Sequence, residues 1–301
     1  MIQLRLHDVS FRQPDVALPV IRQTSLTLAP GLYYLFGANG SGKSTLLKGL
    51  AGILAPASGN ISLARHNQVI EGMEYKLYTG YAPQEASYYN GLTVMQYLKY
   101  IAGMRLIPAP LIASRIEDVT RLLGLTGMGK RRLELLSVGQ KKRLMLVQAV
   151  LADPDLLLLD EPLAHADPHE KEMLSEWMSE GGREKVIIVA HHPSERKVDS
   201  NSHILFIMKG QLMGPYSSNE LITELDGRIV SCRVPKLVWE QEKGNCRHQG
   251  LHVLSVKYNA DSVEVRMLME IPGSMPMLPY EIVSPTMEDV FMYFQKVLAQ
   301  E

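Results

Sequence analysis

The sequence predicts an α/β protein built around a mainly parallel sheet, and three observations support this fold class. Two apolar runs, Leu156–Leu159 and Val186–Ala190, are continuous rather than alternating, as in strands that are buried on both faces. Segments with helical spacing separate the predicted strands. A glycine-rich segment, Gly37–Thr45, lies between a predicted strand and a predicted helix, which is a common arrangement in this class.

The composition is typical of a globular protein and does not indicate a nucleic-acid binder. Apolar residues make up 46% of the 301 residues and charged residues 21%, close to the averages for globular proteins. The formal net charge is -1, so no overall positive field favours nucleic acid. Cys232 and Cys246 lack the short spacing of a metal site and suit a reducing compartment. Every apolar run is far shorter than the ~20 residues that cross a bilayer, so a membrane role would need a spanning partner.

The N-terminal region is predicted to form antiparallel strands. Residues 2 to about 35 alternate between apolar and polar positions and are interrupted by proline turns. The first residues follow this strand pattern, so no signal peptide is expected. Phe11 lies at the end of the first strand, and its spacing alone predicts a half-buried strand aromatic.

The segment Gly37–Thr45 matches the phosphate-loop pattern G-x-x-x-x-G-K-[ST]. In the strand–loop–helix context, backbone N–H groups and the helix N-terminus can bind phosphate. Lys43 adds a full positive charge toward the β- and γ-phosphates, and the Ser44 hydroxyl suits Mg²⁺. A glycine turn that opens an ordinary helix is the alternative, and nucleotide binding is the preferred interpretation. The predicted phosphate-binding residues are Gly37, Ala38, Asn39, Gly40, Ser41, Gly42, Lys43, Ser44 and Thr45.

Residues 92–152 have helical spacing and are predicted to form a separate group of helices. Thr93 can cap one helix and Ser137 another, and a further helix is expected over about Ile112–Leu123.

Two buried strands end in polar side chains that should meet at one edge of the sheet. Asp160 and Glu161 follow the leucine run, and His191 follows the second apolar strand. A carboxylate pair at a buried strand end is costly unless a cation or polar ligand is bound. Beside a phosphate loop, Mg²⁺ is the predicted cation. The alternatives are a strand that simply reaches solvent and a histidine with a structural role.

Beyond about Asp226 the pattern changes to short alternating strands and one final helix, which predicts a small α+β appendix. Thr286 followed by Asp289 is close to a capping box for that helix. The predicted domains are therefore residues 1–225, with a helical subdomain at about 86–150, and residues 226–301. The predicted strands of the appendix are Arg228–Val234, His252–Tyr258 and Ser262–Met269.

The order and spacing of these motifs resemble the ATP-binding subunit of an ATP-binding cassette (ABC) transporter over roughly residues 2–225. The Leu-Ser-x-Gly-Gln signature separates this family from other phosphate-loop enzymes. The resemblance implies a P-loop NTPase fold with an antiparallel N-terminal subdomain and a helical signature subdomain. The matching segments are Gly37–Thr45 as Walker A, Tyr81–Gln84 as Q-loop, Leu136–Gln140 as signature, Leu156–Glu161 as Walker B, Ala164–Asp167 as D-loop and His191 as switch histidine.

The resemblance also implies roles for the matching residues. Phe11 would stack on the adenine, and Lys43 with the loop amides would hold the phosphates. Glu161 would polarise the attacking water as general base, and His191 would contact the γ-phosphate. Ser44, Gln84 and Asp160 would bind the Mg²⁺ ion.

The signature is expected to act on a second subunit. Ser137 and Gly139 would reach the γ-phosphate bound to the opposite subunit, and Gln140 belongs to the same nucleotide-binding segment. Two ATP-binding subunits would therefore close face to face.

Three positions depart from the family pattern. Val138 stands where glycine is usual in the signature, and Ala164–Asp167 lacks the common leading serine. His192 follows His191 where an acidic residue is frequent, and His191 is favoured as the switch because it directly follows the apolar strand.

The implied function is an ATP-hydrolysing subunit, cytoplasmic and peripheral at the membrane, that powers a separate permease. Pro285–Phe291 resembles the end of export-type ATPases of the drug and bacteriocin-resistance branch, which implies a bacterial exporter. The alternative is a soluble ABC ATPase that acts on nucleic acid or ribosomes, but the sequence shows neither a coiled-coil insertion nor a second cassette. A simple nucleotide kinase is disfavoured by the signature. The cargo, and whether the dimer is homo- or heteromeric, stay open.

Overall fold

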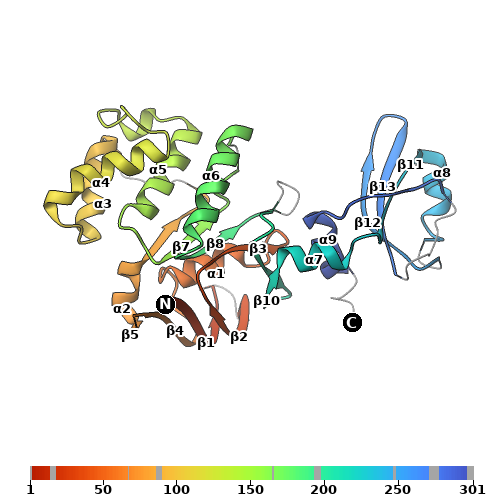
Figure 1. Ribbon diagram of the computed structural model, residues 1–301, viewed down its shortest axis with the longest axis horizontal. Coiled ribbons are helices and arrows are strands. Elements are labelled where there is room, and N and C mark those ends of the chain that lie inside the picture. Colours follow the sequence, from red (N-terminus) through yellow and green to blue (C-terminus); the bar gives the residue numbers. More distant parts are fainter. Residues whose placement is uncertain are drawn as a thin grey trace. The chain divides into compact units, whose positions relative to one another are not determined.

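A computed structural model of the chain describes residues 2–13, 18–66, 68–85, 90–164, 166–192, 198–246, 249–270 and 278–296. The chain divides into two compact units (Figure 1). The first unit comprises Met1–His192 and Ser202–Pro215, and the second comprises Pro193–Asn201 and Tyr216–Glu301. Each unit has its own hydrophobic core.

The first two strands of the first unit pair antiparallel as predicted, and two later strands complete a sheet in the order β2-β1-β4-β5. Residues 31–35, at the end of the region predicted to be antiparallel, instead belong to a parallel strand of the second sheet. Along β1 the buried residues Leu4 and Leu6 alternate with exposed ones, because only one face of this sheet is covered. The strands are β1 (Gln3–Phe11), β2 (Ile21–Leu28), β4 (Ser58–Arg65) and β5 (Gln68–Glu71).

A second sheet of six strands carries the site and has the order β10-β9-β3-β8-β7-β6. Its central pairs are parallel, and every residue of β7 and β8 is buried, which confirms the predicted fold class. The strands are β3 (Gly31–Gly37), β6 (Thr79–Ala82), β7 (Leu156–Asp160), β8 (Val186–Ala190), β9 (His203–Met208) and β10 (Gln211–Ser217).

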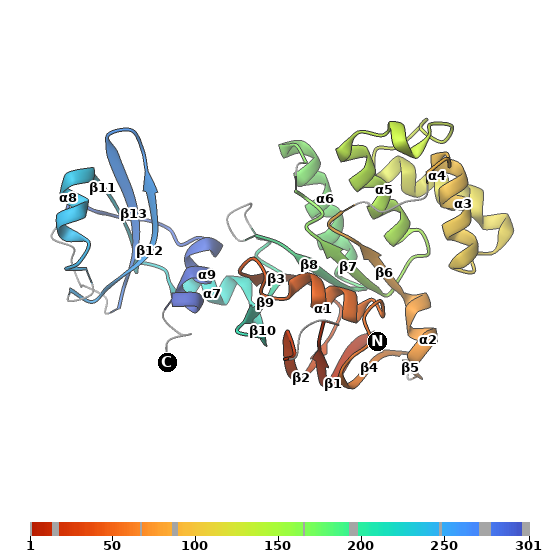
Figure 2. The same cartoon turned by 180° about the vertical axis from the view of Figure 1, so that it is seen from behind.

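Helix α1 (Lys43–Leu50) lies between the two sheets, and α6 (Pro168–Gly181) lies on the opposite face of the six-stranded sheet (Figures 1 and 2). Leu46 and Leu47 of α1 share one core with Leu4 of β1 and Leu158 of β7. The leucine spacing after the phosphate loop therefore positions α1, because it gives this helix apolar side chains for both sheets.

The helices between β6 and β7 are held by two capping boxes. The side chains of Thr93 and Gln96 exchange hydrogen bonds with each other's backbone N–H groups, and Ser137 and Gln140 do the same. Both predicted caps are thus confirmed. Helix α4 begins at Ala109 and not at about Ile112 as predicted. It includes Pro110, because proline is tolerated in the first turn of a helix. The segments are α2 (Gly72–Tyr75), η1 (Lys76–Tyr78), α3 (Val94–Met104), α4 (Ala109–Leu122), η2 (Leu133–Leu135) and α5 (Val138–Val150).

The second unit is a four-stranded antiparallel sheet, β12-β13-β11-β14, with short helices. The structure adds α8, which the sequence pattern does not indicate, because Trp239 is the one buried residue of its seven. The segments are α7 (Ser218–Glu224), β11 (Ile229–Pro235), α8 (Lys236–Glu242), β12 (Leu251–Tyr258), β13 (Ser262–Met269), β14 (Glu281–Ile282) and α9 (Met287–Lys296).

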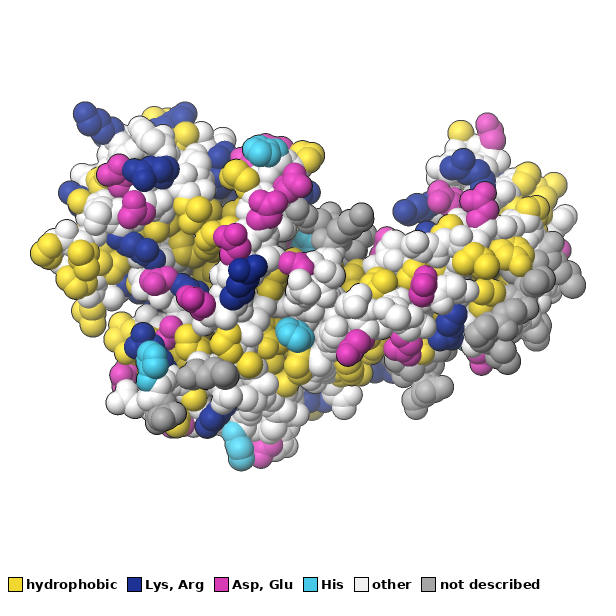
Figure 3. Space-filling model, in the orientation of Figure 1, with side chains coloured by type: hydrophobic (Ala, Val, Ile, Leu, Met, Phe, Trp, Pro, Cys, Tyr) yellow, Lys and Arg dark blue, Asp and Glu magenta, His cyan; other side chains and the backbone are white. Residues whose placement is uncertain are grey.

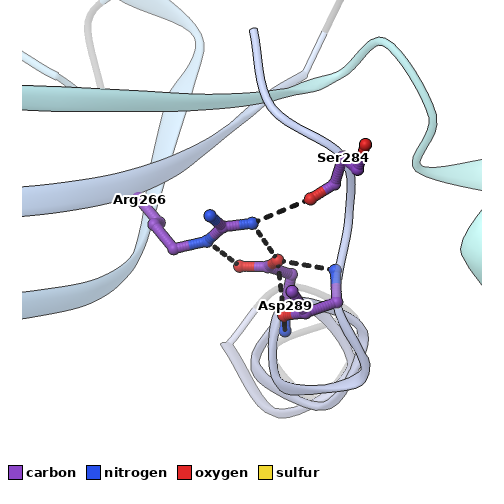
Figure 4. A network of polar contacts seen from close by, with 4 residues as sticks. Arg266, Ser284 and Asp289 are labelled. Carbon is purple, nitrogen blue, oxygen red and sulfur yellow. Dashed lines mark hydrogen bonds and ion pairs between the residues drawn. The ribbon is translucent and has the colours of Figure 1, made fainter. Parts of the chain in front are cut away.

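A buried ion pair joins α9 to this sheet (Figure 4). Arg266 donates from Nε to Asp289 Oδ1 at 2.9 Å and from Nη2 to Oδ2 at 2.6 Å. The Thr286 N–H also donates to Asp289 Oδ2, at 2.8 Å, and the Asp289 N–H donates to Thr286 Oγ1 at 3.3 Å. The predicted cap is confirmed, and the same carboxylate also fastens the helix to β13.

Among the described residues, no helix is both long enough and apolar enough to cross a membrane.

Candidate functional site

The phosphate-loop segment is a tight turn from β3 into α1. Gly42 has φ 107°, a left-handed conformation that favours glycine. An added side-chain carbon there would lie 2.8 Å from Val20 Cγ1 and 2.9 Å from Ile21 Cδ1, so the start of β2 packs directly against the loop. A side chain at Gly37 would collide with Ser41 Oγ. Ala38 is exposed, as are the two residues that follow it, so the tip of the turn is open to a ligand.

Lys43 is held inside this turn. Its Nζ donates to the carbonyl oxygens of Gly37 at 2.8 Å and Ala38 at 3.2 Å. Burial lowers the pKa of Lys43, and the nearby carboxylates of Glu161 and Asp160 oppose that shift. The ammonium group therefore lies at the centre of the turn with both carboxylates close by.

Asp160 ends β7 and is 3% exposed. Burial raises the pKa of its carboxyl group, which is partly offset by a hydrogen bond from Ser44. Ser44 lies in the first turn of α1, so this contact joins the phosphate loop to the end of β7. Asp160 therefore lies next to the phosphate loop, as its position at the end of a parallel strand predicts.

Glu161 begins the loop after β7 and has φ 50°. Its N–H donates to Ala190 O at 3.1 Å, and Gln84 Nε2 donates to its Oε2 at 2.9 Å. Lys142 Nζ on α5 donates to the Glu161 carbonyl oxygen at 3.4 Å. The ends of β6, β7 and β8 thus meet at Glu161, which follows from their parallel pairing.

His191 and Glu161 are neighbours, because they follow the paired residues Ala190 and Asp160. The His191 ring is only 2% exposed and lies 5.9 Å from the Tyr34 ring, centroid to centroid. The contact of His191 with a γ-phosphate remains a prediction. His192 is exposed.

The structure contradicts the adenine-stacking role of Phe11. The ring is 0% exposed and belongs to the core that α1 shares with both sheets. It lies against Gly49 so closely that any side chain there would collide with it. A fully buried ring has no free face for a base, so the interpretation from spacing, a strand aromatic, was nearer to the structure.

The signature segment lies at the start of α5. Ser137 is exposed, and nothing lies within 4 Å of an added carbon at Gly139. Within the described part of the chain, no hydrogen bond or ion pair joins Ser137, Gly139 or Gln140 to the phosphate loop. Val138 is 67% exposed and so has no packing role in this chain.

The segment Ala164–Asp167 leads into α6. Asp167 accepts a hydrogen bond from the Glu170 N–H at 2.9 Å and so caps that helix. His165, in the middle of this segment, lies outside the described residues.

Two polar atoms of the site are buried without a hydrogen-bond partner among the described residues, Ser41 Oγ and the Tyr81 hydroxyl. Buried polar groups are ordinarily satisfied, so each is suited to a ligand group that carries donors or acceptors. Tyr81 lies beside Asp160, whose negative charge adds to burial in raising the tyrosine pKa. Sequence reasoning assigned Tyr81 no role of its own, because a tyrosine in a strand is usually a packing residue.

The donor set at this edge fits Mg²⁺. The hydroxyl of Ser44, the carboxylate of Asp160 and the amide oxygen of Gln84 are hard oxygen ligands. Among the described residues, no group of three or more His, Cys, Asp or Glu side chains forms a complete metal cage. Mg²⁺ typically uses one or two carboxylates together with substrate phosphates, so a partial donor set is what such a site requires.

Comparisons with known proteins agree with this geometry. Residues 21–164 match the model of a protein family described as ABC transporter. The sulfate/thiosulfate import ATP-binding protein CysA of Thermosynechococcus vestitus is 30% identical over 195 residues, which cover 64% of this chain and 58% of that protein. The molybdenum import ATP-binding protein ModC of Pseudomonas syringae pv. tomato is 30% identical over 221 residues, which cover 70% and 58%.

A solved structure described as the ATP binding subunit of an ABC transporter has the same fold. Its TM-score is 0.63 at 24% identity, and the match covers 73% of this chain and 92% of that one. The chain spans about 58% of the length of the two curated relatives.

Proposed function

We propose that the chain, whose residues 21–164 match the ABC transporter family model, is an ATP-binding subunit that hydrolyses ATP and thereby drives a separate membrane permease. The observation that carries this proposal is the convergence of five groups at one sheet edge. The convergent residues are Lys43, Ser44, Gln84, Asp160 and Glu161.

The phosphates are proposed to bind the loop amides, the α1 N-terminus and Lys43. Mg²⁺, held by Ser44, Asp160 and Gln84 together with the phosphates, would neutralise their charge. Glu161 would orient and deprotonate the attacking water. The bond from Gln84 reaches only Oε2 of the Glu161 carboxylate, and an ionised carboxylate has about four acceptor positions, so it can accept a hydrogen bond from water at the same time. General-base assistance of this kind typically contributes ~10²- to 10⁴-fold in rate.

The exposed signature supports a site shared between two ATP-binding subunits. Ser137 and Gly139 are open to a partner. We infer that they, with Gln140, contact nucleotide bound to a second subunit, identical or different.

The test of Glu161 is the isosteric change Glu161→Gln. We expect ATP binding to persist and hydrolysis to fall by at least about 100-fold, because an amide does not act as a base. An ATP-dependent dimer should then accumulate in size-exclusion chromatography. Glu172→Gln, an exposed glutamate of α6, is the matched control. Normal hydrolysis by Glu161→Gln would remove Glu161 from this role.

An exposed apolar patch at the α3–α4 turn is the proposed permease contact, which would hold the chain at the cytoplasmic face of a membrane. Figure 3 shows hydrophobic side chains gathered over this end of the first unit. The patch comprises Tyr100 (46% exposed), Met104 (62%), Leu106 (71%) and Leu111 (55%). Surfaces of this kind mark interaction sites.

Membrane association provides the test of this patch. Met104→Glu and Leu106→Glu should abolish co-sedimentation with membranes and leave ATP binding intact. Leu237→Glu, at a residue that is 72% exposed in the second unit, is the control. Unchanged co-sedimentation of a variant that combines Met104→Glu with Leu106→Glu would contradict the proposed contact. Association of the wild-type chain with ribosomes or DNA alone would contradict a transport role.

For the direction of transport we propose export, and the support is the resemblance of Pro285–Phe291 to export-type ATPases. The two curated relatives described above are named for import, so a direct measurement is needed. The permease that co-purifies, reconstituted with this chain in vesicles with ATP outside, should accumulate its cargo inside. ATP-driven release of cargo from those vesicles would identify an importer.

A further inference from the structure

The hydroxyl group of Tyr81 is a buried polar group that the fold does not use. Its oxygen is shielded from solvent, although the residue as a whole is half-buried, and it has no hydrogen-bond partner among the residues that the structure describes. A tyrosine hydroxyl both donates and accepts hydrogen bonds, and burying it without a partner costs free energy of folding. Tyr75 shows the ordinary arrangement, because its hydroxyl donates to the Leu50 carbonyl oxygen at 2.6 Å.

The register of the sheet places the Tyr81 side chain beside Asp160. Tyr81 in β6 is paired with Leu158 in the parallel strand β7, and residues paired in this way lie on the same face of a sheet. Both side chains pack in the core that α1 shares with the two sheets. Asp160 follows Leu158 by two residues, so it lies on this face too, where it accepts a hydrogen bond from Ser44. The tyrosine ring and the carboxylate are therefore neighbours on adjacent strands.

We propose that Tyr81 is a positioning residue whose hydroxyl, together with the Asp160 carboxylate, holds a water molecule of Mg²⁺ when nucleotide is bound. This inference rests on the proposed nucleotide binding at the phosphate loop. Mg²⁺ gives up its waters reluctantly and keeps several of them in protein sites, so a site for it needs groups that hold water as well as direct ligands. Burial and the charge of Asp160 raise the pKa of Tyr81, so its hydroxyl stays protonated at neutral pH and can both donate and accept.

The test measures binding of a non-hydrolysable ATP analogue to the full-length chain by calorimetry, once with Mg²⁺ and once with a chelator. Tyr81→Phe should weaken binding with Mg²⁺ about three- to tenfold, which is the range that one hydrogen bond contributes, and leave binding without Mg²⁺ unchanged. No loss with Mg²⁺, or an equal loss in both conditions, would overturn the inference and leave the proposed function in place. Failure of the wild-type chain to bind with Mg²⁺ would instead overturn the proposed function.

Thermal unfolding without nucleotide and Mg²⁺ separates this role from a structural one. Tyr81→Phe removes a hydroxyl that has no partner among the described residues, so the melting temperature should be unchanged or higher. Tyr75→Phe is the matched control, because it removes a buried hydroxyl that is hydrogen-bonded. It should lower the melting temperature and leave Mg²⁺-dependent binding unchanged. A melting temperature of Tyr81→Phe below that of wild type would show that the hydroxyl serves the fold, and would overturn the assignment.

Discussion

At the scale of single residues, several polar groups of the site are hydrogen-bonded to one another. Lys43 bonds to carbonyl oxygens of its own loop, and Gln84 bonds to Glu161. Ser44 bonds to Asp160. In the proposed function, the phosphates and Mg²⁺ would therefore replace hydrogen bonds that these residues make with one another. This arrangement limits the cost of keeping a buried lysine and a buried carboxyl group at one sheet edge.

Asp160 should lower the stability of the ligand-free protein near neutral pH. Burial raises its folded-state pKa above the unfolded value, so ionisation is costlier in the folded state. Asp160→Asn removes that cost and still accepts the bond from Ser44, so the melting temperature should rise. The gain should be largest above the raised pKa. It should vanish as pH falls below about 4, where the carboxyl group is protonated in both states.

Thermal unfolding between pH 4 and 8 without Mg²⁺ checks this prediction. Asp261→Asn, at an exposed turn, is the control and should change the melting temperature little at any pH. A lower melting temperature for Asp160→Asn at pH 7.5 would contradict the prediction.

At the scale of secondary-structure elements, one kind of N-terminal cap recurs inside and outside the site. Thr93 and Ser137 each cap a helix with a glutamine three residues later. Ser137 is also the proposed contact to a nucleotide on a second subunit. A loss of activity on removing its hydroxyl therefore has two possible causes, and the second capping box allows them to be separated.

Ser137→Ala should lower the free energy of unfolding by about 1 kcal/mol, because an N-cap acceptor is lost. Ser137→Asn retains a capping oxygen and should stay within a few tenths of a kcal/mol of wild type. Both should reduce ATP hydrolysis if the hydroxyl contacts phosphate. Thr93→Ala is the control and should lower stability similarly without reducing hydrolysis. Urea unfolding and steady-state hydrolysis are the measurements, and full activity of Ser137→Asn would refute the phosphate contact.

At the scale of the whole molecule, the chain contains two separately packed units. Their cores share no residue. The sequence contains two tryptophans, and each unit holds one, Trp177 in α6 and Trp239 in α8. Variants with a single tryptophan therefore report on one unit each.

We predict two unfolding transitions with different sensitivities. ATP at 100 times its dissociation constant should stabilise the unit of Trp177 by about 2.7 kcal/mol and leave that of Trp239 unchanged. Asp289→Ala should destabilise the unit of Trp239 by about 3–5 kcal/mol, because it leaves the mostly buried Arg266 without its partner. Glu240→Gln, in the exposed pair with Lys243, is its control and should not change that transition measurably.

Urea unfolding is followed by tryptophan fluorescence in two variants. Trp239→Phe leaves Trp177 to report on the first unit, and Trp177→Phe leaves Trp239 to report on the second. Coincident transitions that both shift with ATP would show that the units unfold as one.

Local chemistry was sufficient to predict several features. The glycine loop, the doubly buried strands and the three helix caps depend on residues within a few positions of one another, and the structure confirms them. The convergence of Asp160 and Glu161 with the phosphate loop also followed from sequence, because parallel strands end at one edge of a sheet.

Only the tertiary structure decided which face each side chain presents and what it meets there. Phe11 is buried rather than open to a base, because α1 approaches β1 at Gly49. The Gln84–Glu161 bond and the Arg266–Asp289 pair join residues that are distant in sequence. Sequence spacing determines the motifs and the order of the elements, because these depend on short-range chemistry. Burial and long-range partners depend on how the elements pack, which no local pattern specifies.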